Sequence, residues 1–222
     1  MIVLHHVPQS RSMRVLWLLH ELGVEFRMRE HPFDKSLRRP EFLSLSPAGR
    51  VPALEIEGER MFESGAMVEY LCERFPDAGL GRLPGDMDRM AWLVWVHFAE
   101  TISQHVASLT QQHIALYDDA MRSPVVMRLE AARLGKCYEA IEARLSTPVE
   151  NRDHLLTSGF SACDICVGQA VYMARHFART DGFPELEAWY ARITERPAFQ
   201  ASLPGPESGR IYRRNFYEAW DG

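Results

Sequence analysis

The chain has 222 residues, of which 46% are hydrophobic and 25% are charged. At about 150 residues per domain, this length predicts one or two compact domains, and the composition excludes a largely disordered chain. Lys and Arg total 25 against 30 Asp and Glu, and the resulting formal charge of −5 is dispersed rather than gathered in a basic patch. We therefore expect a folded protein with no nucleic-acid partner.

Apolar run lengths and cysteine usage bear on where the protein works. The longest apolar runs are short pieces such as Val15–Leu19 and Ala91–Val96, far below the roughly 18 residues of a membrane span. The first residues lack the cationic start and long apolar stretch of a signal peptide. The four cysteines do not have the spacing of a secreted disulfide framework. These features predict a cytoplasmic protein with no membrane partner.

Residues 1–76 alternate short strand patterns with helical ones. Ile2–His5 is β-prone, Val15–Leu22 has helical spacing and stops at Gly23, and residues 24–28 alternate apolar and charged side chains, which predicts a strand with one buried face. The remaining predicted elements are a short helix at 40–43, a hairpin over 51–62 and a helix from Ser64 to Phe75. The order β-α-β-α-β-β-α is the layout of a thioredoxin-like α/β domain.

The pattern changes after Pro76. Residues 77–85 are rich in Gly and Pro and indicate a linker. Residues 86–222 show only helical spacing, so we expect an all-α domain there. Its predicted helices cover 86–117, a segment from Ser123-Pro124 to Leu145, a segment from Ser161 to about Arg179, a short helix from Pro184 and a last one from Pro197.

Three motifs occur in an order and at separations that match a known family. They are Val51-Pro52-Ala53-Leu54, Glu63-Ser64 at the start of a helix, and Gly159-Phe160-Ser161-Ala162-Cys163-Asp164-Ile165 in the helical part. The chain resembles the cytosolic glutathione S-transferases over nearly its whole length. The loop Pro8-Gln9-Ser10-Arg11-Ser12-Met13-Arg14-Val15 is similar to the active-site loop of the bacterial, theta-like serine branch. The resemblance implies a transferase that binds glutathione as co-substrate and delivers it to an electrophilic small molecule.

Such a reaction needs a thiolate, and a free thiol with a pKa of about 8.5 is mostly protonated at neutral pH. A hydroxyl at the N-terminus of the first helix stabilises the anion together with the helix dipole. Aligning Arg14-Val15 with the family pattern puts Ser10 at the catalytic position. Ser12 is the alternative, because the loop could be registered two residues later, and Arg11 could add positive potential. Tyr70 is the first Tyr or Cys in the chain, which disfavours the tyrosine classes and a cysteine nucleophile.

The resemblance also implies the glutathione contacts. Val51, joined to Pro52 by a bond that is cis in this family, pairs with the cysteinyl unit. Ser64 begins a helix, where backbone amides and the dipole favour an anion such as the γ-glutamyl carboxylate, and Glu63 offers a charge to the α-amino group. Ser64 could also serve as a helix cap alone. The candidates for the glycyl carboxylate, each of which could instead be solvated surface, are Arg50, Arg38 and Arg39.

The electrophile pocket in this family lies between the active-site loop and the first helix of the helical domain. Trp95, Phe98 and Glu100 are the candidate wall residues, and these aromatic residues could also be core or interface. The resemblance further implies a homodimer, for which Arg74 and residues 87–90 are candidate contacts. Two other reactions of the same site, glutathione-dependent isomerisation and dehalogenation, remain open, as does a non-catalytic glutathione-binding or regulatory module of the same fold.

Two residue patterns resemble metal or redox sites, but we expect both to have structural roles. Cys163 and Cys166 have C-x-x-C spacing, but Ser161 and Asp164 form a capping-box pattern there, so we predict buried cysteines and a structural Asp164. The histidines His97, His105 and His113 recur every eight residues, a spacing that does not place them on one helix face. We therefore expect no metal.

Overall fold

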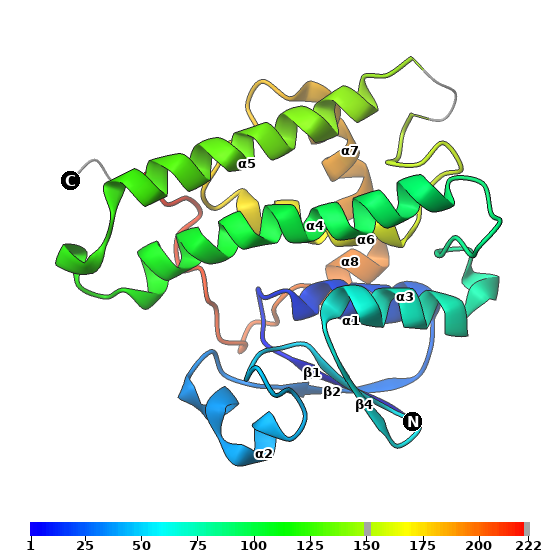
Figure 1. The fold of residues 1–222 in the computed structure, drawn as a ribbon, viewed down its shortest axis with the longest axis horizontal. Helices are drawn as coiled ribbons and strands as arrows, with labels where there is room; N and C mark the ends of the chain where they lie inside the picture. The colour runs from blue at the N-terminus through cyan, green and yellow to red at the C-terminus, as the bar shows by residue number, and fades with distance from the viewer. Residues whose placement is uncertain (149–151, 220–222) are drawn as a thin grey trace. The chain divides into compact units, whose positions relative to one another are not determined.

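The computed structural model describes residues 1–148 and 152–219, so residues 149–151 and 220–222 of the predicted helical domain lie outside the described residues. The chain divides into two compact units (Figure 1). The first contains Met1–Asp86 and Glu195–Ile211, and the second contains Met87–Thr194 and the residues from Tyr212 onward. Within the described ranges, no helix combines the length and the hydropathy needed to cross a bilayer.

A four-stranded mixed sheet lies at the centre of the first unit. The strands are β1 (Ile2–His6), β2 (Phe26–Glu30), β3 (Ala53–Ile56) and β4 (Glu59–Phe62), in the order β2-β1-β3-β4. Strand β1 runs parallel to β2 and antiparallel to β3, and β3 pairs with β4 as a hairpin. The predicted α/β fold class is confirmed.

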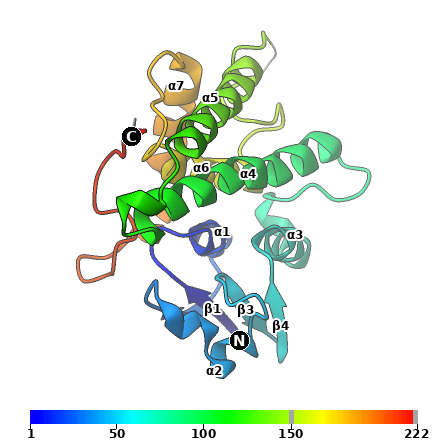
Figure 2. The same ribbon diagram turned by 60° about the vertical axis from the view of Figure 1, so that its left-hand side comes forward.

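Helices cover both faces of this sheet. They are α1 (Ser12–Leu22), η1 (Lys35–Arg38), α2 (Pro40–Leu43), α3 (Ser64–Arg74) and η2 (Pro76–Ala78). Helices α1 and α3 lie on one face and α2 on the other (Figure 2). Helix α1 ends where the sequence predicts, because Gly23 adopts φ 63° and its N–H donates to the His20 carbonyl.

Strand β2 differs from the prediction for residues 24–28. It lies two residues later, and its alternating pattern gives no buried face, since the Met28 side chain is 46% exposed. The reason is position: β2 is an edge strand, paired with β1 alone.

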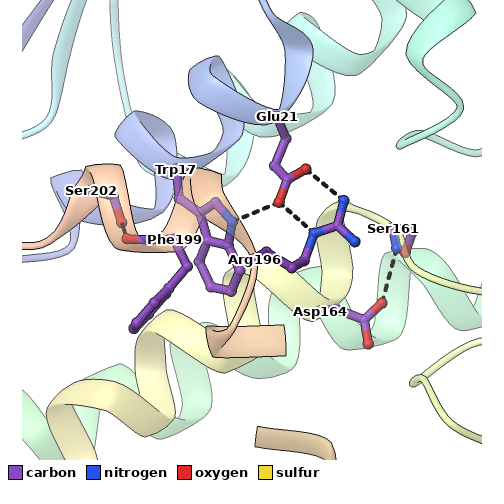
Figure 3. A network of polar contacts seen from close by, with 7 residues as sticks. All are labelled: Trp17, Glu21, Ser161, Asp164, Arg196, Phe199 and Ser202. Carbon is purple, nitrogen blue, oxygen red and sulfur yellow. Dashed lines mark hydrogen bonds and ion pairs between the residues drawn. The ribbon is translucent and has the colours of Figure 1, made fainter. Parts of the chain in front are cut away.

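The last predicted helix also differs in where it belongs. Helix α8 (Pro197–Ser202), predicted as part of the helical domain, packs on α1 of the first unit. The Trp17 and Phe199 rings meet edge to face at 4.9 Å. The Arg196 guanidinium holds the Glu21 carboxylate at 2.6 and 2.7 Å, and Trp17 Nε1 donates to the same carboxylate at 3.0 Å (Figure 3).

The Arg196→Ala variant is expected to lower the free energy of unfolding by about 2 kcal/mol. The Glu21 side chain is only 8% exposed, so the substitution leaves a mostly buried carboxylate with fewer donors, while the 39% exposure of Arg196 moderates the loss. Urea unfolding measures the change. Arg60→Ala, which removes an exposed arginine of the same unit, is the control and should change stability by less than about 0.5 kcal/mol. Equal effects of the two substitutions would contradict this account of how α8 is held.

The second unit is built from helices. They are α4 (Arg89–Thr110), the π-helical turn η3 (Gln111–Ala115), η4 (Asp119–Met121), α5 (Pro124–Leu145), α6 (Ala162–Ala174) and α7 (Pro184–Thr194). Helix α6 is the core element: it is buried along almost its whole length and packs against α4 and α7. The helix predicted over 86–117 is shorter because Asp88, at φ 64°, precedes its first turn and the α-helical pattern ends at Thr110.

Local capping predictions in this unit hold. Ser123 accepts a hydrogen bond from the Val126 N–H at the start of α5, and Ser161 and Asp164 form the capping box of α6. Cys163 and Cys166 are buried and unbridged on that helix, as predicted. Helix α6 ends at Ala174, before the predicted end near Arg179.

The chain beyond Ile211 packs on the second unit. The Tyr212 ring stacks on His176 at 4.4 Å, and the Tyr212 hydroxyl lies 2.9 Å from Thr110 Oγ1. The Tyr217 N–H donates to the His176 carbonyl at 2.8 Å. These contacts fix the tail against α4 and the end of α6.

Candidate active site

Ser10 lies in the loop between β1 and α1 and Ser12 is the first residue of α1, and the two side chains are in different environments. Ser12 is fully buried: its Oγ accepts a hydrogen bond from the Val7 N–H at 3.1 Å and lies 2.8 Å from His6 Nδ1. Ser10 is half-buried, its Oγ lies 2.7 Å from Ser12 Oγ, and it accepts a hydrogen bond from the Ser12 N–H at 3.2 Å. Ser10 is therefore the more exposed of the two residues, whereas the Ser12 side chain is enclosed. Arg11, between them, is half-buried at the N-cap of α1.

His6 forms the inner end of this group of side chains and is 3% exposed. Burial lowers the pKa of His6 from 6.5 to about 4, so the imidazole is neutral at neutral pH. Sequence reasoning missed this residue, although a histidine at the end of a strand that leads into the serine loop is a usable signal.

The low pKa of His6 predicts a loss of stability in acid. Because the unfolded chain takes up this proton near pH 6.5 and the folded chain only near pH 4, stability is full above pH 6.5 and falls as the pH drops toward 4. The expected contribution at pH 4.5 is about 2–3 kcal/mol. Urea unfolding of the wild type and of His6→Asn at pH 7 and pH 4.5 measures it: the wild type should lose more stability by about that amount. An equal loss in both proteins would contradict the prediction.

The second group of predicted residues lies at the start of α3. Glu63 is the N-cap residue, with φ 75° and ψ 108°, and its side chain makes no cap hydrogen bond. Non-glycine residues in such conformations concentrate at functional sites. Ser64 is 5% exposed and is the first residue of the helix rather than its cap, which differs from the capping role considered for it.

A buried arginine adds charge to this helix terminus. Arg14, on α1, is fully buried, and its Nη1 donates to Ser64 Oγ at 3.3 Å. Helix N-termini favour anions, and a guanidinium beside the first turn of α3 strengthens that preference. Sequence reasoning used Arg14 only to align the loop. The signal for its role was an arginine within an otherwise apolar helical stretch, between Met13 and Val15.

The remaining candidate residues of the first unit lie at the end of η1 and in the loop before β3. The Val51-Pro52 peptide bond is cis, as the resemblance implies. Arg50, Arg38 and Arg39 are all exposed. The Arg38 side chain lies close to Gly49, which adopts φ 62°, and a Cβ at Gly49 would come within 2.9 Å of the Leu37 carbonyl oxygen. The segments that carry these arginines therefore contact each other at a position that only glycine fits.

Gly49→Ala is expected to raise the KM for glutathione about fivefold and to lower the free energy of unfolding by about 1–2 kcal/mol. The added Cβ forces the Leu37 backbone and the 49–52 loop apart, which displaces Val51 and Arg50. The matched control is Gly58→Ala, which has positive φ but no atom within 4 Å of its Cβ, and should lose stability without a change in KM. Steady-state kinetics and urea unfolding give both numbers. An unchanged KM in Gly49→Ala would show that the 49–52 loop does not contribute to glutathione binding.

The candidate electrophile residues lie on α4 of the second unit. The Trp95 and Phe98 rings meet edge to face at 5.3 Å. At about 100° per residue, Glu100 points to the side of α4 opposite Phe98, so the three side chains do not form one wall. Phe98 also lines a cavity of about 520 Å³ between α4 and α5, together with Thr101, Gln104, His105, Arg133, Lys136, Cys137 and Ala140.

The histidines of α4 and η3 take separate roles. His105 Nδ1 lies 2.6 Å from Glu130 Oε2, and His113 stacks on Phe177 with ring centroids 5.5 Å apart. Among residues 1–148 and 152–219, no group of three or more His, Cys, Asp or Glu side chains is arranged to hold a metal ion.

Two family models match the chain in order. The glutathione S-transferase N-terminal domain matches residues 4–79, and the glutathione S-transferase C-terminal domain matches residues 125–197. Glutathione S-transferase 3 of Zea mays is 29% identical over 221 residues, which cover 91% of this chain and 95% of the maize protein. Glutathione S-transferase 3 of Schizosaccharomyces pombe is 24% identical over 221 residues, which cover 95% of this chain and 90% of that protein.

Solved structures share the fold. A glutathione transferase of Phanerochaete chrysosporium, crystallised with oxidized glutathione, aligns with a TM-score of 0.80 at 24% identity and covers 90% of this chain and 92% of its own. A bacterial beta class glutathione S-transferase of Sphingomonas chungbukensis aligns with a TM-score of 0.77 at 24% identity, covering 90% and 96%. With both of its domain models matched in sequence order, this chain belongs to the cytosolic glutathione S-transferase family.

Proposed function

We propose that this protein is a serine-type glutathione transferase in which the Ser10 hydroxyl donates a hydrogen bond to the glutathione sulfur. The observation that supports this most directly is the contrast between the two serines: Ser10 is half-buried and Ser12 is fully buried. Ser10 also precedes the first turn of α1, where the helix dipole favours a negative charge. The hydroxyl and the dipole together lower the pKa of the bound thiol and supply the thiolate that attacks an electrophile.

The tripeptide is held at its two ends and its middle. Ser64 and the first amides of α3 bind the γ-glutamyl carboxylate, with the buried Arg14 guanidinium behind them. Glu63 accepts the α-amino group, since its exposed carboxylate stands at the same helix terminus. The Val51 backbone pairs with the cysteinyl unit, and the glycyl carboxylate binds one of the exposed arginines Arg50, Arg38 and Arg39.

The second substrate is an electrophilic small molecule. Trp95 and Phe98 form the aromatic part of its pocket, and Glu100 has no place in that wall because it points to the opposite side of α4. Isomerisation and dehalogenation use the same activated thiolate, so a panel of aryl halides, haloalkanes and isomerisable enones separates these reactions.

The test of the proposal is a glutathione titration at neutral pH, with thiolate followed by its ultraviolet absorbance and binding followed by calorimetry. We expect saturable binding together with a thiolate signal, and turnover of at least one electrophile of the panel. Binding without thiolate would favour a non-catalytic glutathione-binding module. An absence of binding would overturn the proposal.

We also propose that the protein acts as a homodimer in the reducing cytoplasm. Several apolar side chains are exposed on α4, on the segment before it and at the start of α5. They are Met87, Met90, Val94, Val125 and Leu129. Such side chains are typical of an interface. Arg74, at the end of α3, pairs with Glu57 and is a further candidate contact. All four cysteines are unbridged, which supports a reducing compartment. Light scattering of the wild type and of Val94→Glu tests the dimer, since the charged variant should be monomeric.

A further inference from the structure

We infer that His5 and His31 are positioning residues: they anchor residues 33–50 to the sheet and so control how tightly the protein binds the glycyl end of glutathione. Residues 33–50 (the α2 segment) include α2 and the three exposed arginines proposed as partners of the glycyl carboxylate. The inference rests on the proposed function, because it starts from that assignment. It adds a role for two histidines that belong to none of the sequence motifs.

The two histidines at the end of β1 point to opposite faces of the sheet, since successive side chains of a strand alternate between faces. His6 contacts Ser12 of α1. The His5 ring instead meets the Phe42 ring of α2 edge to face, with centroids 6.0 Å apart. His5 therefore lies on the face that α2 covers, opposite α1 and α3 (Figure 2).

His5 is only 1% exposed, and both of its ring nitrogens have a partner. Nε2 lies 3.1 Å from Glu55 Oε1 on β3, and Nδ1 lies 2.9 Å from Nε2 of His31. Because an imidazole nitrogen can donate or accept according to the tautomer, either ring can be the donor in the second bond. In both cases Glu55, His5 and His31 form one hydrogen-bonded chain across the sheet.

His31 connects this chain to α2. Its ring lies nearly parallel to that of His5, with centroids 5.1 Å apart, and meets the Phe42 ring edge to face, also at 5.1 Å. Phe42 is 5% exposed, and edge-to-face ring pairs are favourable beyond the area they bury. The Phe42 ring thus packs on both imidazoles, which are held in turn by β1 and β3.

The α2 segment has a second attachment to the sheet, but it is exposed. Arg60 Nη1, on β4, donates to the Ser44 carbonyl at 3.2 Å. An exposed hydrogen bond exchanges readily with water and contributes little. The buried rings are therefore the stronger of these two attachments. His31 is also where the chain leaves the sheet, since its N–H makes the hydrogen bond to the His6 carbonyl just beyond β2.

Removing the His31 ring takes one neighbour from Phe42 and leaves the buried Nδ1 of His5 without this partner. An unmet polar atom in the interior is costly, so the α2 segment should be held less firmly. Its arginines must then be ordered when the ligand binds, which lowers affinity. The γ-glutamyl end and the sulfur are proposed to bind at other residues. The loss should therefore be confined to the glycyl end.

The experiment compares, by calorimetry, the Kd of glutathione with that of its glycyl ethyl ester, which lacks only the charge of the glycyl carboxylate. The wild type should bind glutathione about tenfold more tightly than the ester. His31→Leu should reduce this preference about fivefold, with the Kd of the ester unchanged within about twofold. Steady-state kinetics of the same variant should show a higher KM for glutathione with kcat unchanged.

Two further variants separate the hydrogen-bonded chain from a general loss of packing. His31→Gln carries an amide that can donate to or accept from the His5 nitrogen, and should keep at least about half of the wild-type preference. His20→Leu is the matched control. It removes a half-buried imidazole of the same unit that meets the Phe26 ring edge to face at 5.1 Å, and should keep the full preference.

If His31→Leu does not fold, Phe42→Leu carries the test with the same expected loss, because it keeps an apolar side chain and removes the ring. The inference is overturned if the folded variant keeps the wild-type preference, if His31→Gln loses as much as His31→Leu, or if His20→Leu loses as much. A wild type that binds the ester as tightly as glutathione would overturn it too. A wild type without saturable glutathione binding would instead overturn the proposed function.

Discussion

Replacing Asp164 with alanine is expected to destabilise the second unit by on the order of 5 kcal/mol, a large part of the stability of a typical domain. The Asp164 carboxylate is fully buried and accepts three N–H groups. The donors are the Leu155 N–H at 3.0 Å, the Ser161 N–H at 3.0 Å and Trp189 Nε1–H at 2.9 Å. Alanine leaves all three buried without an acceptor, at a cost of about 1–3 kcal/mol each.

Urea unfolding followed by circular dichroism measures this effect. If the variant is too unstable to fold, it will be recovered in the insoluble fraction, which also agrees with the prediction. Asp119→Ala is the control, because the Asp119 side chain is 70% exposed and its loss should cost less than about 0.5 kcal/mol. Asp164→Asn should lie between the two, since it keeps one oxygen but turns an amide donor toward another donor. A loss below about 1 kcal/mol in Asp164→Ala would show that the α6 capping box is dispensable.

Replacing Ser10 with alanine is expected to lower kcat about 100- to 1000-fold and to change the KM for glutathione less than about threefold. In the proposed function the Ser10 hydroxyl interacts with the sulfur, whereas the ends of the tripeptide bind at other residues of the first unit. The effect should shrink as the pH rises, because hydroxide then ionises the thiol without help from the protein.

The pH dependence of kcat/KM provides the diagnostic measurement for Ser10→Ala, since its midpoint should move upward relative to the wild type. Ser44→Ala removes an exposed hydroxyl of the same unit and should leave the profile unchanged. A loss that is the same at all pH values would point to a structural role for Ser10. Retained turnover in Ser10→Ala would move the catalytic role to another donor.

Local signals were sufficient for most of the elements. Gly23 ends α1, and Ser161 with Asp164 begins α6, because the hydrogen bonds involved join residues close in sequence. The same is true of the apolar spacing that predicts α1, α3 and α5. The prediction of a buried face on β2 was wrong, because the place of this strand at the sheet edge depends on strands 20 or more residues away in sequence.

The candidate site residues that belong to a sequence motif could be proposed from the sequence. Those that only tertiary contacts bring to the site were missed. The proposals for Ser10, Val51 and Ser64 follow from motifs, and the preference for Ser10 over Ser12 rests on the exposures of the two residues. Arg14 lies 50 residues from Ser64 in the chain, so no sequence window shows their contact. His6 is near Ser12 in sequence, but only the bend of the loop between them turns the two side chains together.

The contact of α8 with α1 has a consequence for the order in which the chain can fold. The first unit is discontinuous, because its last segment, Glu195–Ile211, is separated from Asp86 by more than a hundred residues. During synthesis, the side of α1 that carries Trp17 and Glu21 stays uncovered until α8 has been synthesised. A protein truncated after Asp86 would keep every predicted glutathione contact and still lack the Arg196 and Phe199 side chains that cover this helix. The first unit is therefore completed only after the helices of the second unit have been synthesised.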